Sequence, residues 1–100
     1  MDGQTVKLVS IVAETVLTES LVAALKNLGA TGYTITDVVG DGSRHIRSGD
    51  LPGENIRIET ITTREIADHL LNVLANEYFP HFAIIAFVSD VNVVRGAKYV

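Results

Sequence analysis

Apolar and polar residues alternate along four segments of the chain with the period of two that is typical of β-strands. The first and the fourth of these segments carry apolar residues on both of their faces, so both faces of those strands should be covered. The predicted strands are Thr5–Ala13, Gly32–Val39, Asn55–Ile61 and Ala83–Val94.

Between the first two strands, leucines recur at the spacing of an α-helix. The pattern predicts a helix over Leu17–Leu28. Thr18 is the expected N-cap, because a hydroxyl can accept a hydrogen bond from the free amides of a first turn. Gly29 is expected to end the helix, since glycine readily adopts the left-handed conformation that closes many helices.

A second helical period follows the third strand and extends to about Tyr78. It opens on Thr62-Thr63-Arg64-Glu65, which has the spacing of a capping box. In that motif the Thr62 hydroxyl accepts from the Glu65 amide, and the Glu65 carboxylate reaches back to the start of the helix. Pro80 is expected to end the helix, because proline cannot continue it.

The resulting order of elements is β-α-β-β-α-β, over residues 1–100 as a single domain. This is the order of a ferredoxin-like α+β fold, in which two helices cover one face of an antiparallel sheet. The other face has no helix, yet the first and fourth strands carry apolar residues on it. An exposed apolar face marks a contact surface, so we expect a homo-oligomer that packs sheet to sheet.

The segment Gly29–Gly53 contains six of the eight glycines of the chain, and its second part, Gly40–Gly53, fits neither a helix nor a strand. A loop of about fourteen residues in a small domain is usually functional or disordered. Arg44 and Arg47 lie there among glycines and serines, a mixture that suits an anion such as a phosphate. A solvated loop tip of the same composition is the alternative. The spacing matches neither a Walker A motif nor a dinucleotide fingerprint.

Composition argues against several classes of function. With 47% apolar and 20% charged residues, the 100-residue chain is globular. Its net charge of −4 argues against nucleic-acid binding. The chain has no cysteine, so it has no thiol nucleophile and no thiolate metal site. It shows neither a membrane-spanning run nor a signal-peptide pattern, and we expect a cytoplasmic protein without membrane insertion.

Other candidate residues fit structural roles better than catalytic ones. His45, His69 and His81 have no metal-binding partner three or four residues away, so no metal site is expected. Asp37 and Asp41 are candidates for an acid–base pair, but aspartates in turns are commoner than catalytic ones. We therefore expect no catalytic residue, and a protein that is not an enzyme.

Two strings of residues resemble those of the PII-like signalling proteins. They are G-A-T-G-Y-T, over Gly29–Thr34, and G-D-G-S-R-H-I-R-S-G, over Gly40–Gly49. The second string is similar to the G-x-G-S-R-x-x-R-S pattern of the subgroup linked to bicarbonate transporters and carboxysome gene clusters. The resemblance covers nearly the whole chain and implies a homotrimer with a T-loop at residues 40–54.

In that family the two arginines at the base of the T-loop contact the phosphates of an adenine nucleotide, in clefts between subunits. The resemblance therefore implies binding of AMP or ADP, with ATP and cyclic AMP as further candidates, and no resident cofactor. Bicarbonate is a second candidate ligand, and a bicarbonate transporter or a carboxysome component is the implied protein target. The residues assigned to nucleotide binding are Tyr33, Thr34, Gly42, Ser43, Arg44, Arg47, Ser48 and Lys98.

The chain also departs from the PII pattern. Its loop has no tyrosine for uridylylation, and the junction Tyr78–Phe82 lacks the glycine- and lysine-rich phosphate loop of true PII proteins. By residue type, Tyr33 is more often a packed aromatic than an adenine contact. Lys98 is either a tail charge or a contact to a neighbour's nucleotide. Because a fold does not define a function, a small trimeric metal-binding or structural protein is the alternative.

Overall fold

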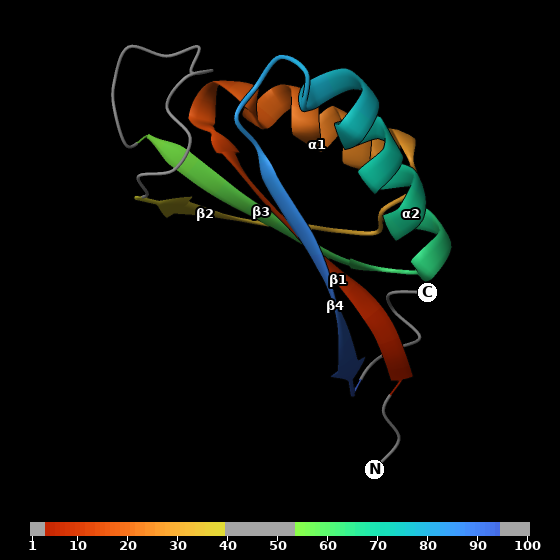
Figure 1. Ribbon diagram of the computed structural model, residues 1–100. Coiled ribbons are helices and arrows are strands. Elements are labelled where there is room, and N and C mark those ends of the chain that lie inside the picture. Colours follow the sequence, from red (N-terminus) through yellow and green to blue (C-terminus); the bar gives the residue numbers. More distant parts are fainter. Residues whose placement is uncertain (1–3, 40–53, 95–100) are drawn as a thin grey trace.

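The computed structural model describes residues 4–39 and 54–94. Within these residues the elements follow the predicted order β-α-β-β-α-β, and short helical turns adjoin both helices (Figure 1). The element boundaries lie within one or two residues of the predicted ones. They are β1 Gln4–Glu14, η1 Thr15–Leu17, α1 Thr18–Asn27, β2 Thr34–Val38, β3 Asn55–Thr62, α2 Arg64–Val73, η2 Leu74–Tyr78 and β4 Ile85–Val93.

The strands form one antiparallel sheet in the order β2-β3-β1-β4. The first strand is central, because β1 pairs with β3 on one side and with β4 on the other. Both helices lie on the same face of the sheet, and among the described residues no helix lies on the opposite face (Figure 1). The ferredoxin-like α+β fold predicted from the sequence is therefore confirmed.

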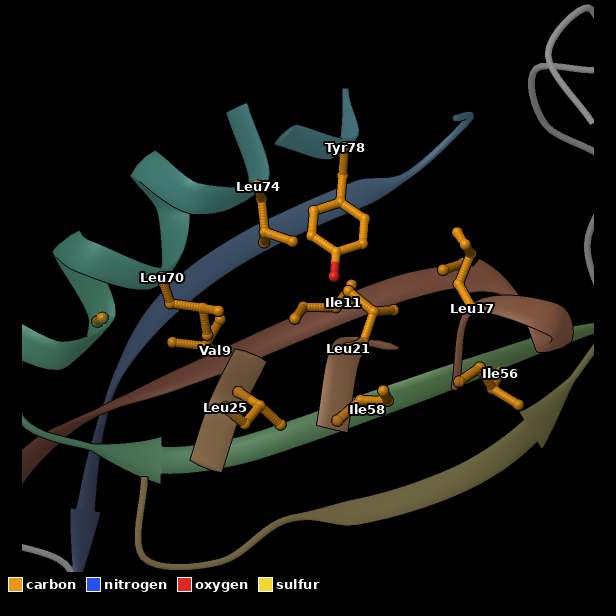
Figure 2. Packing of buried hydrophobic residues seen from close by; sticks show 12 residues of the cluster. Val9, Ile11, Leu17, Leu21, Leu25, Ile56, Ile58, Leu70, Leu74 and Tyr78 are labelled. Atoms are coloured by element: carbon orange, nitrogen blue, oxygen red, sulfur yellow. The ribbon is translucent and has the colours of Figure 1, made fainter. Parts of the chain in front are cut away.

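The hydrophobic core lies between the sheet and the helices (Figure 2). Strands β1, β3 and β4 contribute alternate residues to it, because successive side chains of a strand point to opposite faces, whereas β2 is largely exposed. Each helix contributes one stripe of side chains at helical spacing. Full burial of a side chain of this size stabilises the fold by roughly 1.5–3 kcal/mol. The largest buried members are Val9, Ile11, Leu21, Leu25, Ile56, Ile58, Leu70 and Leu74.

The second helix ends in a wider π-helical turn, η2, in which the amide of Phe79 donates to the carbonyl of Leu74 at 2.8 Å. The turn stops at Tyr78, two residues before Pro80, as the sequence predicts. The Tyr78 ring is buried over the core, and its hydroxyl forms a hydrogen bond with the hydroxyl of Ser20. This bond joins the end of η2 to the first turn of α1.

The start of α1 differs from the prediction that Thr18 caps it. The turn η1 leads directly into the helix, so Thr18 already lies inside it, and Leu17 occupies the cap position without a side-chain hydrogen bond. The Thr18 hydroxyl instead donates to the carbonyl of Thr15 at 2.6 Å. The predicted end is confirmed, because Gly29 has a φ of 89°, a left-handed conformation that glycine adopts without strain.

The capping residue of α2 is Thr63, so the prediction of Thr62 was wrong by one position. Thr62 is the last residue of β3, where it pairs with Lys7 and is almost fully buried. The extended residue Thr63 accepts a hydrogen bond from the amide of Ile66 at 3.3 Å. Pairing with β1 keeps Thr62 in the sheet, and the next threonine therefore caps the helix.

The face of the sheet without helices carries large apolar side chains on β4. Ile85 is 58% exposed and Phe87 is 48% exposed. The strand register places Val12 and Ser10 of β1 beside them. In a single chain this apolar surface is open to solvent, as the sequence pattern predicts, and we refer to it below as the open face.

Candidate functional site

A groove with a volume of about 400 Å³ lies where β3 runs past the start of β2. The second strand begins at Thr34, which pairs with Glu59, whereas β3 continues to Thr62. The residues that connect α1 to β2 form one wall of the groove. Its lining residues are Leu8, Thr31, Gly32, Tyr33, Thr34, Glu59, Thr60 and Ile61.

Two hydrogen bonds hold the walls of the groove. The Thr60 hydroxyl donates to the carbonyl of Gly32 at 2.5 Å, and it joins β3 to the segment ahead of β2. The Ser10 hydroxyl donates to the Glu59 carboxylate at 2.9 Å. Thr60 and Ser10 are both almost fully buried, so their hydroxyls require partners inside the protein. The first bond positions the segment that leads to Thr34, and the second orients the carboxylate.

The groove combines apolar surface with polar groups at its rim. Leu8 and Ile61 are paired across β1 and β3 and supply the apolar part. The side chain of Tyr33 is 41% exposed, and Thr34 beside it is also exposed. Glu59 adds a carboxylate that can accept hydrogen bonds. This arrangement suits a flat, partly apolar ligand that also carries hydroxyl groups.

The groove also borders a free edge of β3. The ladder between β2 and β3 ends at the pair Thr34–Glu59, so no described strand pairs with residues 60–62 on that side. Backbone amides and carbonyls at such an edge remain available as donors and acceptors. A planar heterocycle with a neighbouring donor and acceptor can bind them much as an added strand would.

A second hollow, also of about 400 Å³, lies at the opposite end of β2. The amide of Thr15 donates to the carbonyl of Glu54 at 3.3 Å and ties η1 to the residue that precedes β3. Asp37 and Glu54 make this hollow acidic, which disfavours an anion there. Asp41, the candidate acid–base partner of Asp37, lies outside the described residues. The hollow is lined by Thr15, Asp37, Val38, Val39, Glu54 and Asn55.

Of the residues predicted to bind nucleotide, Tyr33 and Thr34 lie in the groove. The others, like the predicted T-loop at residues 40–54 except for Glu54, lie outside the described residues. Those residues are Gly42, Ser43, Arg44, Arg47, Ser48 and Lys98.

Sequence reasoning did not single out the groove residues contributed by β1 and β3, such as Leu8, Glu59 and Ile61. In the sequence these residues are recognisable only as ordinary positions of strands in which apolar and polar residues alternate. The signal that identifies them is the pairing of β2 with β3, because it brings the start of β2 beside Glu59. A register of this kind is a property of the folded sheet.

The described histidines do not assemble a metal site. His69 is exposed on α2, and the ring of His81 lies edge to face against that of Phe82. Over residues 4–39 and 54–94, no three His, Asp or Glu side chains are grouped so that they could hold a metal ion. His45 lies outside these ranges.

Within residues 4–39 and 54–94, no helix has both the length and the apolar character needed to cross a membrane.

Residues 6–98 match the family described as nitrogen regulatory protein P-II. The chain belongs to the PII family. It is similar to a protein from Thermus thermophilus described as a PII-like signalling protein, with 57% sequence identity and a TM-score of 0.87 over 100% of both chains. The predicted resemblance to PII-like regulatory proteins is therefore confirmed, whereas membership of the carboxysome-linked subgroup stays a prediction.

Structures of CPII from Thiomonas intermedia have the same fold. One shows CPII bound to ADP, AMP and acetate; it is 24% identical, with a TM-score of 0.85 over 99% of this chain and 98% of CPII. Another shows CPII bound to ADP and bicarbonate; it is 25% identical, with a TM-score of 0.84 over 98% of this chain and 97% of CPII. The ligands in these structures are ligands of CPII.

Proposed function

We propose that this PII-family protein binds an adenine nucleotide, ADP or AMP first, with its adenosine part in the groove beside Thr34. The observation that carries the proposal is the groove itself. It places an exposed tyrosine and threonine, a carboxylate and a free strand edge around apolar surface. Adenine is flat and partly apolar, and its N1 acceptor and N6 donor are adjacent, so it matches such an edge.

The phosphates are assigned to the segment that follows β2. From Thr34 to Val38 the strand spans roughly 13 Å at the usual rise of a β-strand, and the chain continues into the glycine-rich loop with Arg44 and Arg47. Two guanidinium groups with backbone amides can neutralise a diphosphate. Gly42, Ser43 and Ser48 are proposed as further phosphate contacts. Lys98 is proposed as a contact from a neighbouring subunit.

The proposed active form is a homotrimer. The open face carries Ile85 and Phe87 as exposed apolar side chains, and packing against other copies would remove them from water. A 100-residue domain buries a limited share of its surface alone, so association adds stability. In this arrangement the groove lies at a seam between subunits.

Signalling is proposed to pass through the T-loop at residues 40–54, which changes its conformation when nucleotide binds.

Bicarbonate is a second proposed ligand, because CPII with bicarbonate and ADP shares this fold at 25% identity. A planar anion of this size could bind to the arginines that hold the phosphates. A role in inorganic carbon metabolism follows, with a bicarbonate transporter or a carboxysome component as the target. The protein is proposed to act in the cytoplasm and to have no catalytic activity.

Calorimetric titration with AMP, ADP, ATP and cyclic AMP, each with and without bicarbonate, tests this proposal. A ligand that binds the folded state must also raise the melting temperature. Replacing Arg47 by Ala should weaken ADP binding by on the order of 1.5–3 kcal/mol, as expected for a charge-assisted hydrogen bond. Arg64→Ala is the control, since this arginine is highly exposed on α2. No nucleotide binding to the wild type, or equal affinity of the Arg47 variant, would contradict the proposal.

A further inference from the structure

The open face is divided into two chemically different parts. Its β4 edge is apolar, with Ile85 and Phe87 exposed. Toward β2 the same face carries charges on β3, where Arg57 pairs in register with Thr36 and Glu59 pairs with Thr34. A face with two unlike parts suits a contact in which each part meets a different neighbour.

Arg57 is an incompletely paired cation on this face. Its Nε atom is shielded from solvent and has no hydrogen-bond partner within the described part of the chain. The strand register places it between Val12 and Thr36, neither of which carries a charge. A shielded guanidinium donor without an acceptor destabilises the fold, because its hydrogen bond to water is lost and no protein acceptor replaces it.

Glu59 carries the complementary charge. Its carboxylate accepts a hydrogen bond from Ser10 at 2.9 Å, which engages only one of its two oxygens. Glu59 follows Arg57 by two residues on β3, so both side chains lie on the open face. The ion pairs found among the described residues, Lys7–Asp90 and Arg64–Asp68, include neither Arg57 nor Glu59.

We propose that Arg57 of each subunit pairs with Glu59 of the next copy, so that three such pairs close the trimer. This inference rests on the trimer of the proposed function and names the groups that hold it together. A guanidinium can donate to both oxygens of a carboxylate at once, which fits the shielded donor and the partly engaged acceptor. The exposed Ile85 and Phe87 then pack at the rim of the same contact.

The same pairing is compatible with a closed ring of three subunits. A twofold contact would form two reciprocal Arg57–Glu59 pairs, so the number of subunits found by native mass spectrometry distinguishes a ring of three from a dimer. In a closed ring of three, each subunit uses different parts of one face toward its two neighbours. Arg57 then meets one neighbour, and Glu59 receives the arginine of the other.

The pairing makes the nucleotide groove a joint property of two subunits. Glu59 lines the groove, so the neighbouring copy's Arg57 would lie at its rim and hold the carboxylate in place. A change at one groove would then act on the contact with the next subunit. Loss of Arg57 should therefore weaken both assembly and ADP binding, although Arg57 lies outside the set of groove-lining residues.

Charge reversal of the full-length chain tests the pairing. Arg57→Glu and Glu59→Arg should each raise the concentration at which the trimer dissociates by at least about tenfold, as expected when a shielded pair becomes two like charges. The double variant should recover to within about threefold of the wild type, because the pair is restored with exchanged signs. Arg64→Glu on the outer surface of α2 is the control and should leave the midpoint unchanged. Sedimentation velocity and native mass spectrometry measure assembly, and circular dichroism verifies folding.

Cross-linking gives a second measurement that does not depend on charge energetics. The chain has no cysteine, so Arg57→Cys with Glu59→Cys introduces its only thiols. With a bifunctional maleimide this variant should form covalent dimers and trimers, because an arginine–glutamate pair holds its Cα atoms farther apart than the roughly 7 Å that a direct disulfide allows. Arg64→Cys with Asp68→Cys, on the outer surface of α2, should remain monomeric on the same gel.

The outcomes separate this inference from the function on which it rests. If the wild type assembles and binds ADP while the double reversal fails to recover and the double-cysteine variant gives only monomer with the maleimide cross-linker, the Arg57–Glu59 pairing is wrong and the nucleotide site stands. A wild type that stays monomeric overturns the pairing together with the trimer. Recovery in the double variant with covalent trimers supports it, whatever nucleotide the protein prefers.

Discussion

The Thr60 hydroxyl donates to the carbonyl of Gly32 at 2.5 Å, although the two residues are 28 positions apart in the sequence. Thr60 lies on β3 and is 2% exposed, whereas Gly32 belongs to the irregular segment ahead of β2. This bond fixes the point at which the chain turns into β2 and thereby sets one wall of the groove. It links the stability of the sheet to the geometry of the candidate site.

Replacing Thr60 by Val should lower the free energy of unfolding by about 1–2 kcal/mol. Valine has nearly the shape of threonine, but it leaves the carbonyl of Gly32 without its donor in a part-buried place. ADP affinity should fall as well, because the wall that carries Thr34 is less well held. Thr5→Val is the matched control, since Thr5 donates to Asn92 in an exposed position. Denaturation at a single protein concentration measures the free energy of unfolding, and calorimetry measures the ADP affinity. An unchanged free energy of unfolding for Thr60→Val would contradict the role of this bond.

Replacing Thr63 by Ala should lower the free energy of unfolding by about 1 kcal/mol, the usual effect of losing an N-cap. The amide of Ile66 would lose the hydroxyl that accepts its hydrogen bond. Thr18→Ala should cost less than half as much, because Thr18 lies inside α1 and does not cap it. Urea denaturation of both variants measures the difference. Equal effects would mean that the cap of α2 contributes no more than an ordinary helical threonine.

The order and type of the elements were predictable from the sequence because their causes are local. Alternation identified the strands, leucine spacing identified the helices, and Gly29 and Pro80 mark helix ends as predicted. The two capping errors arose where tertiary structure decides the outcome. Pairing with Lys7 keeps Thr62 in β3, and the turn η1 places Thr18 inside a helix.

The candidate site was less accessible to sequence reasoning because it depends on strand register. Tyr33 and Thr34 were identified from a motif, and they line the groove. Leu8, Glu59 and Ile61 come from two other strands and approach it only through the pairing of β1, β3 and β2. No local pattern marks such residues, since each has the residue type expected of an ordinary strand position.

Replacing Leu70 by Ala should lower the free energy of unfolding by about 2–5 kcal/mol. Its side chain is fully buried between α2 and the sheet, so its removal leaves a cavity in addition to the lost apolar burial (Figure 2). Leu71→Ala, at the next position, should cost less than half as much, because Leu71 is only partly buried against the core. Chemical denaturation at matched protein concentration compares the two. A larger loss for Leu71 would show that the packing of α2 differs from this structure.

Replacing Thr34 by Val should weaken ADP binding by about two- to tenfold, the effect of one neutral hydrogen bond. Thr34 lines the groove, and valine keeps the β-branched shape that suits a strand. Thr36→Val is the matched control, because Thr36 lies two residues further along the same face of β2 but does not line the groove. Both threonines are exposed, so neither change should alter stability by much. Calorimetric titration compares the two variants. Equal ADP affinities would show that the nucleotide does not bind in this groove and that its nucleoside part binds elsewhere on the chain.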